Sequence, residues 1–328
     1  MHKSLFYLKG EISVKKWALW GSTLAVSAML LSGCGTDDTA NKETTTTEGA
    51  YPQNIQDATG KEVTIKQAPT KIVTLAPYIT ETLFELGLED EVIGVTSNDN
   101  YPAAATKKEQ VGDITPNIEK IIALTPDIVL MDESSIGANE AGIQQLRDAG
   151  ITVFVVPNAA SFEETYKDIT LIGEVTNQQE AAEDIVDDMK AQIADVQQKI
   201  EAAKVEERKV FIETSDAPDI YTAGADSYMQ EMFDLIGADN IAKDGGKAWY
   251  KIDPEAIVKG NPDVIIVQYS YVPDIIDKIK KRDGFNAVTA VKEDRIVQVD
   301  EDTTSRTGPR LADGLEEIAE AVYPEAFK

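Results

Sequence analysis

The chain has 328 residues and a formal net charge of −27, with 31 Lys and Arg against 58 Asp and Glu. Its only histidine is His2 and its only cysteine is Cys34, which excludes an intrachain disulfide, a His/Cys metal cluster and catalysis with a histidine base. The acidity argues against a nucleic-acid partner, because phosphate contacts need clustered Lys and Arg. The length indicates two domains or lobes.

The N-terminal segment has the layout of an export signal. Lys15 and Lys16 precede a mostly apolar stretch, residues 17–31, which is short for a membrane span. The run LSGC at residues 31–34 resembles a bacterial lipobox. It predicts a lipid on Cys34 and attachment to the extracytoplasmic face of the cell membrane. An ordinary signal peptide with a chance cysteine and an uncleaved anchor are the alternatives.

The predicted signal peptide covers residues 1–33, and the residues before Val14 are unusual enough that we take Val14 as the true start. Residues 34–58 are expected to form a lipidated, flexible tether, because their first part is rich in Thr, Asp, Asn and Glu. Removing residues 1–33 takes away four lysines and one glutamate, so the exported chain carries a net charge of −30. That chain has no histidine, and Trp249 is its only tryptophan.

Strand and helix patterns alternate through residues 59–160. Apolar, β-branched runs predict strands at residues 62–65, 71–75, 92–96, 128–131 and 151–156. Stretches between them predict helices at residues 80–88, 117–124 and 142–149. This alternation is typical of a parallel sheet covered by helices, so it predicts an N-terminal α/β lobe.

Residues 161–208 are predicted to be a helical linker, interrupted near residues 173–177. In the second part, residues 178–204, apolar side chains follow helical spacing without Gly or Pro. A second alternating block then begins, and residues 209–328 are predicted to form a C-terminal α/β lobe.

The two blocks share a local sequence pattern. Residues 118–131 read IEKIIALTPDIVLM, and residues 254–267 read PEAIVKGNPDVIIV. A weaker repeat joins residues 81–83 (ETL) and 86–87 (LG) to residues 231–233 (EMF) and 236–237 (IG), with Glu81 and Glu231 in corresponding places. These repeats predict two similar α/β lobes joined by one long, rigid α-helix. The cleft between such lobes is a preferred ligand site.

Several of these segments resemble one family. Residues 71–94 (KIVTLAPYITETLFELGLEDEVIG) and 111–113 resemble the N-lobe of iron-siderophore/cobalamin-type substrate-binding proteins of ABC importers. Residues 220–224, 249–267 and 306–311 resemble its C-lobe, closest to the cobalamin-binding branch. The resemblance implies a class III substrate-binding protein and no enzyme: a monomeric lipoprotein that passes its ligand to a permease dimer with its ATPase. The ligand would be a preformed metal chelate such as cobalamin, so no further cofactor and no metal site are expected.

Loops after the predicted strands supply candidate ligand contacts, because aromatic side chains offer broad, rigid area to a flat macrocycle. These candidates are Tyr78, Tyr101, Tyr221, Trp249, Tyr250, Tyr269, Tyr271, Arg306 and Arg310. The resemblance places Tyr101, Tyr221, Trp249 and Arg310 at cleft-lining positions of the family. Ile114 and residues 132–134 stand where the family has two further aromatic side chains.

Two acidic residues are candidates for docking on the permease. Asn117 and Asp253 are expected to cap the N-termini of the two repeated helices, which places Glu119 and Glu255 in the first helical turn. The resemblance implies that these glutamates pair with arginines of the two permease subunits. A simple interaction with the helix dipole is the alternative.

Other functions remain open at this stage. A ferric siderophore is the alternative ligand, because such complexes are often anionic and Arg306 and Arg310 carry donor forks for anions. Haem is disfavoured because no histidine could ligate its iron. A hydrolase that uses two carboxylates, or a surface lipoprotein without a transport role, are the less favoured classes.

Overall fold

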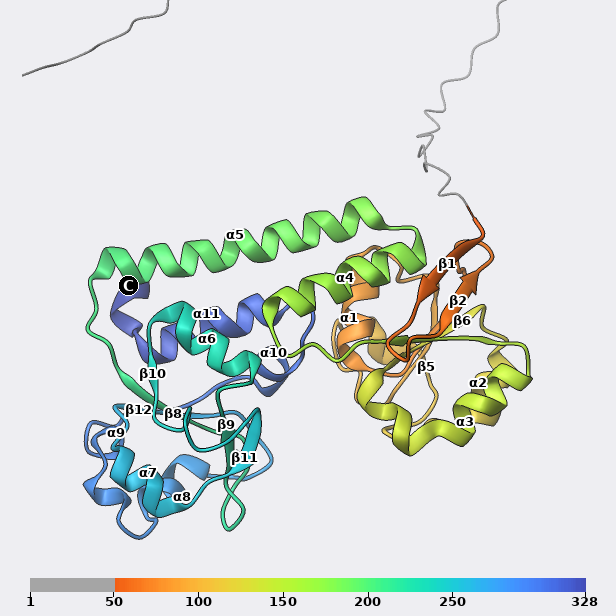
Figure 1. Ribbon diagram of the computed structural model, residues 1–328. Coiled ribbons are helices and arrows are strands. Elements are labelled where there is room, and N and C mark those ends of the chain that lie inside the picture. Colours follow the sequence, from red (N-terminus) through yellow and green to blue (C-terminus); the bar gives the residue numbers. More distant parts are fainter. Residues whose placement is uncertain (1–50) are drawn as a thin grey trace, which may run out of the picture. The chain divides into compact units, whose positions relative to one another are not determined.

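Two parallel sheets form the cores of two lobes (Figure 1). The computed structural model describes residues 51–328, which belong to one compact unit. The first sheet has the order β5-β4-β3-β6-β7, and all its paired strands are parallel. Its strands are β3 (Ile72–Thr74), β4 (Val92–Val95), β5 (Glu109–Gln110), β6 (Ile128–Asp132) and β7 (Thr152–Val156). The predicted N-terminal α/β lobe is thus present.

A hairpin of β1 (Gln53–Gln56) and β2 (Glu62–Ile65) precedes this sheet and packs against β7. Ile55 is buried, and Asp57 Oδ1 accepts hydrogen bonds from the backbone amides of Thr59 (2.9 Å) and Lys61 (3.1 Å) in the turn. The sequence assigned residues 34–58 to the tether, but β1 lies within that range. One buried apolar residue and one turn-forming aspartate suffice to order it.

Three helices cover the first sheet: α1 (Pro77–Glu85), α2 (Ile118–Leu124) and α3 (Ile136–Asp148). Two short turns, η1 (Ala105–Lys107) and η2 (Glu133–Ser135), connect the elements. α3 begins six residues before the expected start at Gly142, because η2 continues directly into it. Gly142 faces α2, since a Cβ there would lie 2.7 Å from Ile118 Cδ1. This glycine permits close helix packing and does not mark a helix end.

The linker consists of two helices, α4 (Phe162–Thr176) and α5 (Gln179–Ala203), which fold back on one another. Ser161 Oγ caps α4 by accepting from the Glu164 amide (3.1 Å), and Asn177 ends it with a positive φ of 62°. α4 contacts α1 and β7 in the N-terminal lobe. The long α5 packs along helices of the other lobe (Figure 1). The lobes are therefore joined by a packed helix pair.

The second sheet has the order β10-β8-β12-β13, again with parallel pairs. Its strands are β8 (Lys209–Glu213), β10 (Asp239–Asn240), β12 (Val264–Val267) and β13 (Ile296–Gln298). A separate two-stranded sheet, the β9–β11 sheet, pairs β9 (Tyr221–Ala223) antiparallel with β11 (Trp249–Lys251), although α6 and β10 lie between them in the chain. The helices are α6 (Tyr228–Ile236), α7 (Pro254–Gly260), α8 (Ile275–Lys280), α9 (Thr289–Lys292), α10 (Glu301–Ser305) and α11 (Leu311–Val322), with turns η3 (Phe285–Ala287) and η4 (Pro324–Phe327). The two-lobed α/β fold is confirmed.

The repeated sequence pattern corresponds to a repeated structure. Asn117 caps α2 and Asp253 caps α7, as expected. Each helix ends at a residue with positive φ and leads into a fully buried strand, β6 or β12. In both lobes the aspartate of the following Pro-Asp pair binds the start of the neighbouring strand. Asp127 Oδ2 accepts from the Lys71 amide (3.0 Å) and Asp263 Oδ2 from the Lys209 amide (2.9 Å).

The predicted signal peptide, the start at Val14 and the lipidation site Cys34 lie outside the described residues. Within residues 51–328, no helix has both the length and the apolar character that a membrane crossing needs.

The contact between α4 and α5 generates a stability prediction. A Cβ at Gly173 would lie 2.5 Å from Ala182 Cβ and 3.0 Å from the Gln178 carbonyl oxygen. Gly173→Ala should therefore push the helices apart and lower the free energy of unfolding by about 1–3 kcal/mol. Gly137→Ala on α3 is the matched control, because nothing lies within 4 Å of its Cβ position. Gly137→Ala should raise the free energy of unfolding by up to about 1 kcal/mol, because alanine has a higher helix propensity than glycine. Urea unfolding followed by circular dichroism measures both, and equal stabilities of the two variants would contradict the close contact.

Candidate functional site

A cavity of about 280 Å³ lies at the carboxyl ends of the N-lobe strands. Its walls come from the segments that follow β3, β4, β6 and β7. The C-terminal lobe contributes Ser305, Arg306 and Thr307. Ligands of open α/β sheets bind at this end of the strands, so both its position and its two-lobed lining favour a binding site.

Tyr78 forms part of the cavity wall. Its side chain is 9% exposed, and its hydroxyl donates to Asp132 Oδ2 (2.8 Å). Burial raises the pKa of Tyr78 well above its usual value, and the charge of Asp132 and the hydrogen bond to it act in the same direction. Tyr78 is therefore a protonated donor that holds Asp132 at the cavity, and it leaves little ring surface for a ligand.

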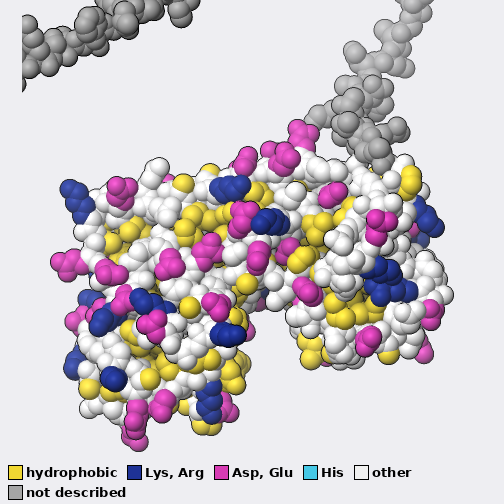
Figure 2. Space-filling view, in the orientation of Figure 1, with side chains coloured by type: hydrophobic (Ala, Val, Ile, Leu, Met, Phe, Trp, Pro, Cys, Tyr) yellow, Lys and Arg dark blue, Asp and Glu magenta, His cyan; other side chains and the backbone are white. Residues whose placement is uncertain are grey.

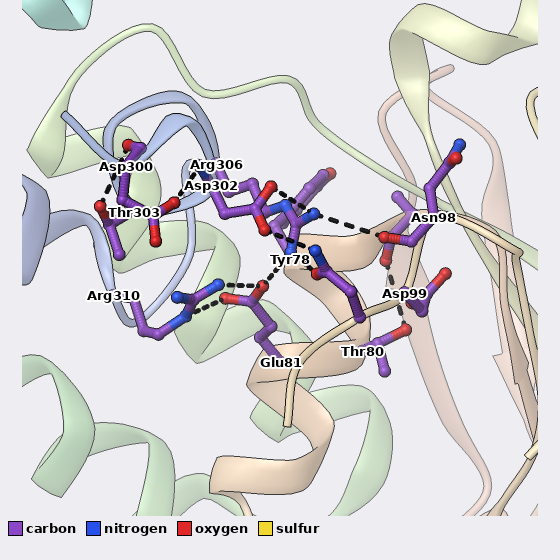
Figure 3. Close-up of polar contacts among 12 residues, drawn as sticks. Tyr78, Thr80, Glu81, Asn98, Asp99, Asp300, Asp302, Thr303, Arg306 and Arg310 are labelled. Atoms are coloured by element: carbon purple, nitrogen blue, oxygen red, sulfur yellow. Dashed lines mark hydrogen bonds and ion pairs between the residues drawn. The ribbon is translucent and has the colours of Figure 1, made fainter. Parts of the chain in front are cut away.

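Arg306 and Arg310 converge on one buried carboxylate (Figure 3). Glu81 on α1 accepts from Arg306 Nη1 (2.6 Å) at Oε1, and from Arg310 at both oxygens (Nη2 2.7 Å, Nε 2.9 Å). Burial opposes the charge of Arg310, yet the hydrogen bonds and the charge of Glu81 raise the pKa of Arg310 above its usual value. Both arginines lie in the predicted cleft between the lobes. Their guanidinium groups, however, bind Glu81 and so hold the two lobes together.

Tyr101 lies on the other side of this cluster. Its ring is 46% exposed, and the Arg310 guanidinium stacks over it at 4.0 Å from the ring centroid. Tyr101 and Arg310 line a second hollow together with Met189 and Gln192 of α5. The structure thus brings Tyr101 and Arg310 together, but outside the lining of the 280 Å³ cavity.

The β9–β11 sheet of the C-terminal lobe presents two predicted contacts on one face. Strand pairing places Trp249 opposite Ala223 and Lys251 opposite Tyr221, so Tyr221 and Trp249 lie on the same face of this sheet. They are 43% and 41% exposed. The ring of Tyr228 supports Trp249 at 5.5 Å between centroids. Both side chains are thus available to a ligand. The half-buried Tyr250 lies on the opposite face and donates to the Ala242 carbonyl (2.6 Å).

Tyr269 is a predicted ligand contact that the structure does not bear out. Its side chain is 1% exposed, and its hydroxyl donates to the buried Glu213 (2.5 Å), which also holds Arg282 (2.6 Å). It belongs to the core of the C-terminal lobe and not to a ligand surface. The neighbouring Tyr271 is exposed, with its ring 4.9 Å from that of Tyr269. An alternating pattern after a strand does not tell which of two tyrosines faces inward.

The sequence also missed parts of the site. Ile114 is 81% exposed and lines the cavity. From the sequence it stands out only as a position at which the family has an aromatic side chain. Asn98 lines the cavity as well, and its carbonyl accepts from Arg306 Nη2 (3.3 Å). One signal in the sequence points to Glu81: it is the only charged residue among the first seven residues of α1, all but the first of which are buried, and a buried charge requires a partner.

Glu119 and Glu255 are both exposed in the first turns of their helices, α2 and α7, as predicted. Figure 1 draws both helices away from α5.

Among residues 51–328, no group of three or more His, Cys, Asp or Glu side chains is arranged to hold a metal ion.

Comparisons with known proteins give the family context. A model of the periplasmic binding protein family matches residues 72–303. An uncharacterized ABC transporter substrate-binding lipoprotein of Bacillus subtilis is 45% identical over 317 residues, which covers 96% of this chain and 99% of the relative. A cobalamin-binding protein of Halobacterium salinarum is 26% identical over 284 residues, which covers 84% and 75%. A solved structure from Staphylococcus epidermidis, described as a possible iron-binding (periplasmic solute-binding) protein, is 35% identical with a TM-score of 0.71. It covers 78% of this chain and 100% of that one.

Asp168 on α4 generates a prediction for the region behind Tyr78. Burial raises the pKa of Asp168 to about 7, and the charges of Glu164, Asp132 and Glu133 add to the rise. Between the usual Asp pKa and 7 the folded state holds a proton that the unfolded state has released, so stability falls as pH rises through this window. Asp168→Asn removes that fall. Its gain in unfolding free energy over the parent should grow from pH 4 to pH 7, to at most about 4 kcal/mol.

Asp127 provides the opposite control. Burial acts to raise the pKa of Asp127, but hydrogen bonds from Thr70 and Lys71 outweigh it and lower the pKa. Asp127→Asn should therefore lose stability at neutral pH and lose less in acid. Denaturant unfolding at pH 4, 5.5, 7 and 8 measures both variants, and a pH-independent effect of Asp168→Asn would contradict the raised pKa.

Proposed function

The chain belongs to the periplasmic binding protein family. We propose that it is a lipid-anchored receptor, which captures a corrinoid such as cobalamin for an ABC importer. As a substrate-binding protein of an ABC transporter, it works with a permease and an ATPase and takes up a small-molecule ligand. The corrinoid, the lipid on Cys34 and the contact residues are the specific parts of the proposal.

The observation that carries the proposal is the pairing of a polar cavity with an exposed aromatic surface. The cavity of about 280 Å³ is below the size of most small-molecule pockets, so a macrocyclic chelate would extend beyond it. Tyr221 and Trp249 on the β9–β11 sheet, and Ile114 at the cavity, offer apolar area for such a ligand. Figure 2 shows a notch between the lobes with hydrophobic side chains on its walls. Similarity to the cobalamin-binding protein of Halobacterium salinarum supports the ligand class.

A ferric siderophore is the second candidate ligand. Similarity to the possible iron-binding protein of Staphylococcus epidermidis supports it, at a higher identity than that of the cobalamin-binding relative. The same aromatic surface could hold the organic part of a siderophore, so the two ligands differ mainly in charge and outline.

The membrane attachment is supported by the Bacillus subtilis relative. That protein is described as a lipoprotein, and its alignment covers 96% of this chain. We place the receptor on the extracytoplasmic face, held by the lipid on Cys34.

A ligand titration tests the proposal. In the processed chain Trp249 is the only tryptophan, so binding at the β9–β11 sheet should change its fluorescence saturably. We expect cobalamin or cobinamide to do so, and Tyr221→Ala to weaken binding about tenfold, since loss of one aromatic contact worth about 1.4 kcal/mol raises the Kd tenfold. Tyr250→Phe, on the opposite face of this sheet, should bind like the parent. Saturable binding of ferric siderophores alone would replace the corrinoid by the second candidate.

A transport assay tests the docking residues. The double variant Glu119→Gln/Glu255→Gln should abolish uptake and leave ligand affinity unchanged, because these carboxylates lie on the first turns of α2 and α7. Glu140→Gln/Glu183→Gln makes the same change in charge at exposed sites on α3 and α5, and it should retain uptake. Equal loss of uptake in both double variants, or lost ligand affinity in the first, would refute the docking role.

A further inference from the structure

The arginines at the cleft are already paired with carboxylates. Arg306 Nη1 bonds to Glu81 Oε1 (2.6 Å) and Asn100 Oδ1 (2.8 Å), and Arg306 Nη2 bonds to Asp302 Oδ1 (2.6 Å). Arg310 directs both of its donors to Glu81 (Figure 3). Two guanidinium charges therefore face two carboxylate charges within this cluster, and its net charge is zero.

We propose that Glu81 makes the cleft selective for neutral or cationic metal chelates and against anionic ones, because together with Asp302 it neutralises Arg306 and Arg310. This inference rests on the proposed function, because it assumes that the ligand is a chelate held in the cleft. It assigns to Glu81 a specificity-determining role, although the cavity lining does not include it.

The cavity itself carries negative charge. Among the described residues that line it, Arg306 is the only basic one, while Asp113 and Asp132 are acidic. Asp113 is exposed, and Asp132 is held by the Tyr78 hydroxyl. With Arg306 neutralised, an anionic ligand meets two carboxylates and no free cation. A neutral ligand does not meet this repulsion.

The C-terminal lobe contains a second buried ion-pair cluster. Glu213 is fully buried at the end of β8, and both of its oxygens accept from Arg282 (2.6 and 2.8 Å). Arg282 also donates to Asp216 (2.8 Å). The Tyr271 hydroxyl accepts from the Asp216 amide (3.1 Å), so the arginine in this region is also paired with carboxylates.

Recruiting an arginine away from Glu81 would not rescue an anionic ligand. Glu81 is 3% exposed, and departure of either arginine would leave this buried carboxylate with one of its two cationic partners. Removing one member of a buried ion pair is strongly unfavourable, so this cost would oppose binding of the anion. The cluster also links α1 to the loop between α10 and α11, so moving Arg306 would break a contact between the lobes.

Calorimetric titration of the purified protein with two charge series tests the inference. The first series is cobalamin and its derivative with one side-chain amide hydrolysed to a carboxylate. The second is a ferric trihydroxamate with a free amine, its neutral N-acetyl form and its anionic N-succinyl form. Within whichever series binds, each added negative charge should weaken binding about tenfold at low salt. The difference should shrink at high salt.

Variants assign the effect to residues. Glu81→Gln leaves the two arginines one positive charge in excess, so it should improve binding of the anionic member about tenfold relative to the neutral one. Asp113→Asn, at an exposed site in the cavity, should reduce the difference in affinity between the neutral and the anionic ligand, and it should not disturb the buried cluster. Glu183→Gln on α5 makes the same change in charge at a residue outside the cavity lining. It should leave the order of ligand affinities unchanged.

The outcomes separate the two proposals. Tight binding with the anionic member preferred by the parent protein would overturn the charge selection and leave the proposed function standing. A Glu81→Gln variant that folds yet keeps the parent's order would overturn the role of Glu81. Failure of every member of both series to bind would overturn the proposed function together with this inference.

Discussion

The contact on which the arrangement of the site depends is the buried carboxylate of Glu81. A charge in the interior is tolerated only when it is paired, and breaking such a pair costs about 3–5 kcal/mol. Glu81 belongs to α1 of the N-terminal lobe, and its partners Arg306 and Arg310 flank the loop between α10 and α11. Because this pairing fixes that loop against the first lobe, Ser305 and Thr307 reach the cavity formed by the N-lobe strands. A single ion-pair cluster therefore closes the site from its second side.

The internal repeat places a glutamate at the corresponding position of each lobe, and the two glutamates bind different partners. Glu231 on α6 is the counterpart of Glu81 on α1, and it also reaches an element beyond its own lobe. Its Oε2 accepts from the Phe162 amide (2.8 Å) at the start of α4. One copy binds two arginines and the other binds a helix N-terminus, where a carboxylate is also favourable. The same place in the fold thus provides contacts from both lobes.

Local signals predicted the fold well, whereas the site depended on long-range pairing. Asn117 and Asp253 were recognisable as caps because an N-cap and the helix it starts are adjacent in sequence. The partners Glu81 and Arg306 are 225 residues apart, and no local pattern joins them. The sequence therefore predicts Arg306 and Arg310 as ligand contacts, with anion binding as their role under the siderophore alternative, and it does not reveal that Glu81 already binds both. Burial of Tyr269 in place of Tyr271 likewise depends on Glu213 and Arg282, which come from other elements of the lobe.

Two separate connections limit how the lobes can move. One is covalent and runs through α4 and α5, which pack closely at Gly173. The other is the cluster of Glu81, Arg306 and Arg310, which joins α1 to the other lobe directly. A hinge motion that opened the cavity would have to break the cluster or separate the helix pair, and both are buried contacts. We therefore propose that a ligand meets a surface that is already formed, and that its affinity depends on its fit to the aromatic face of the β9–β11 sheet and to the charge balance of the cavity.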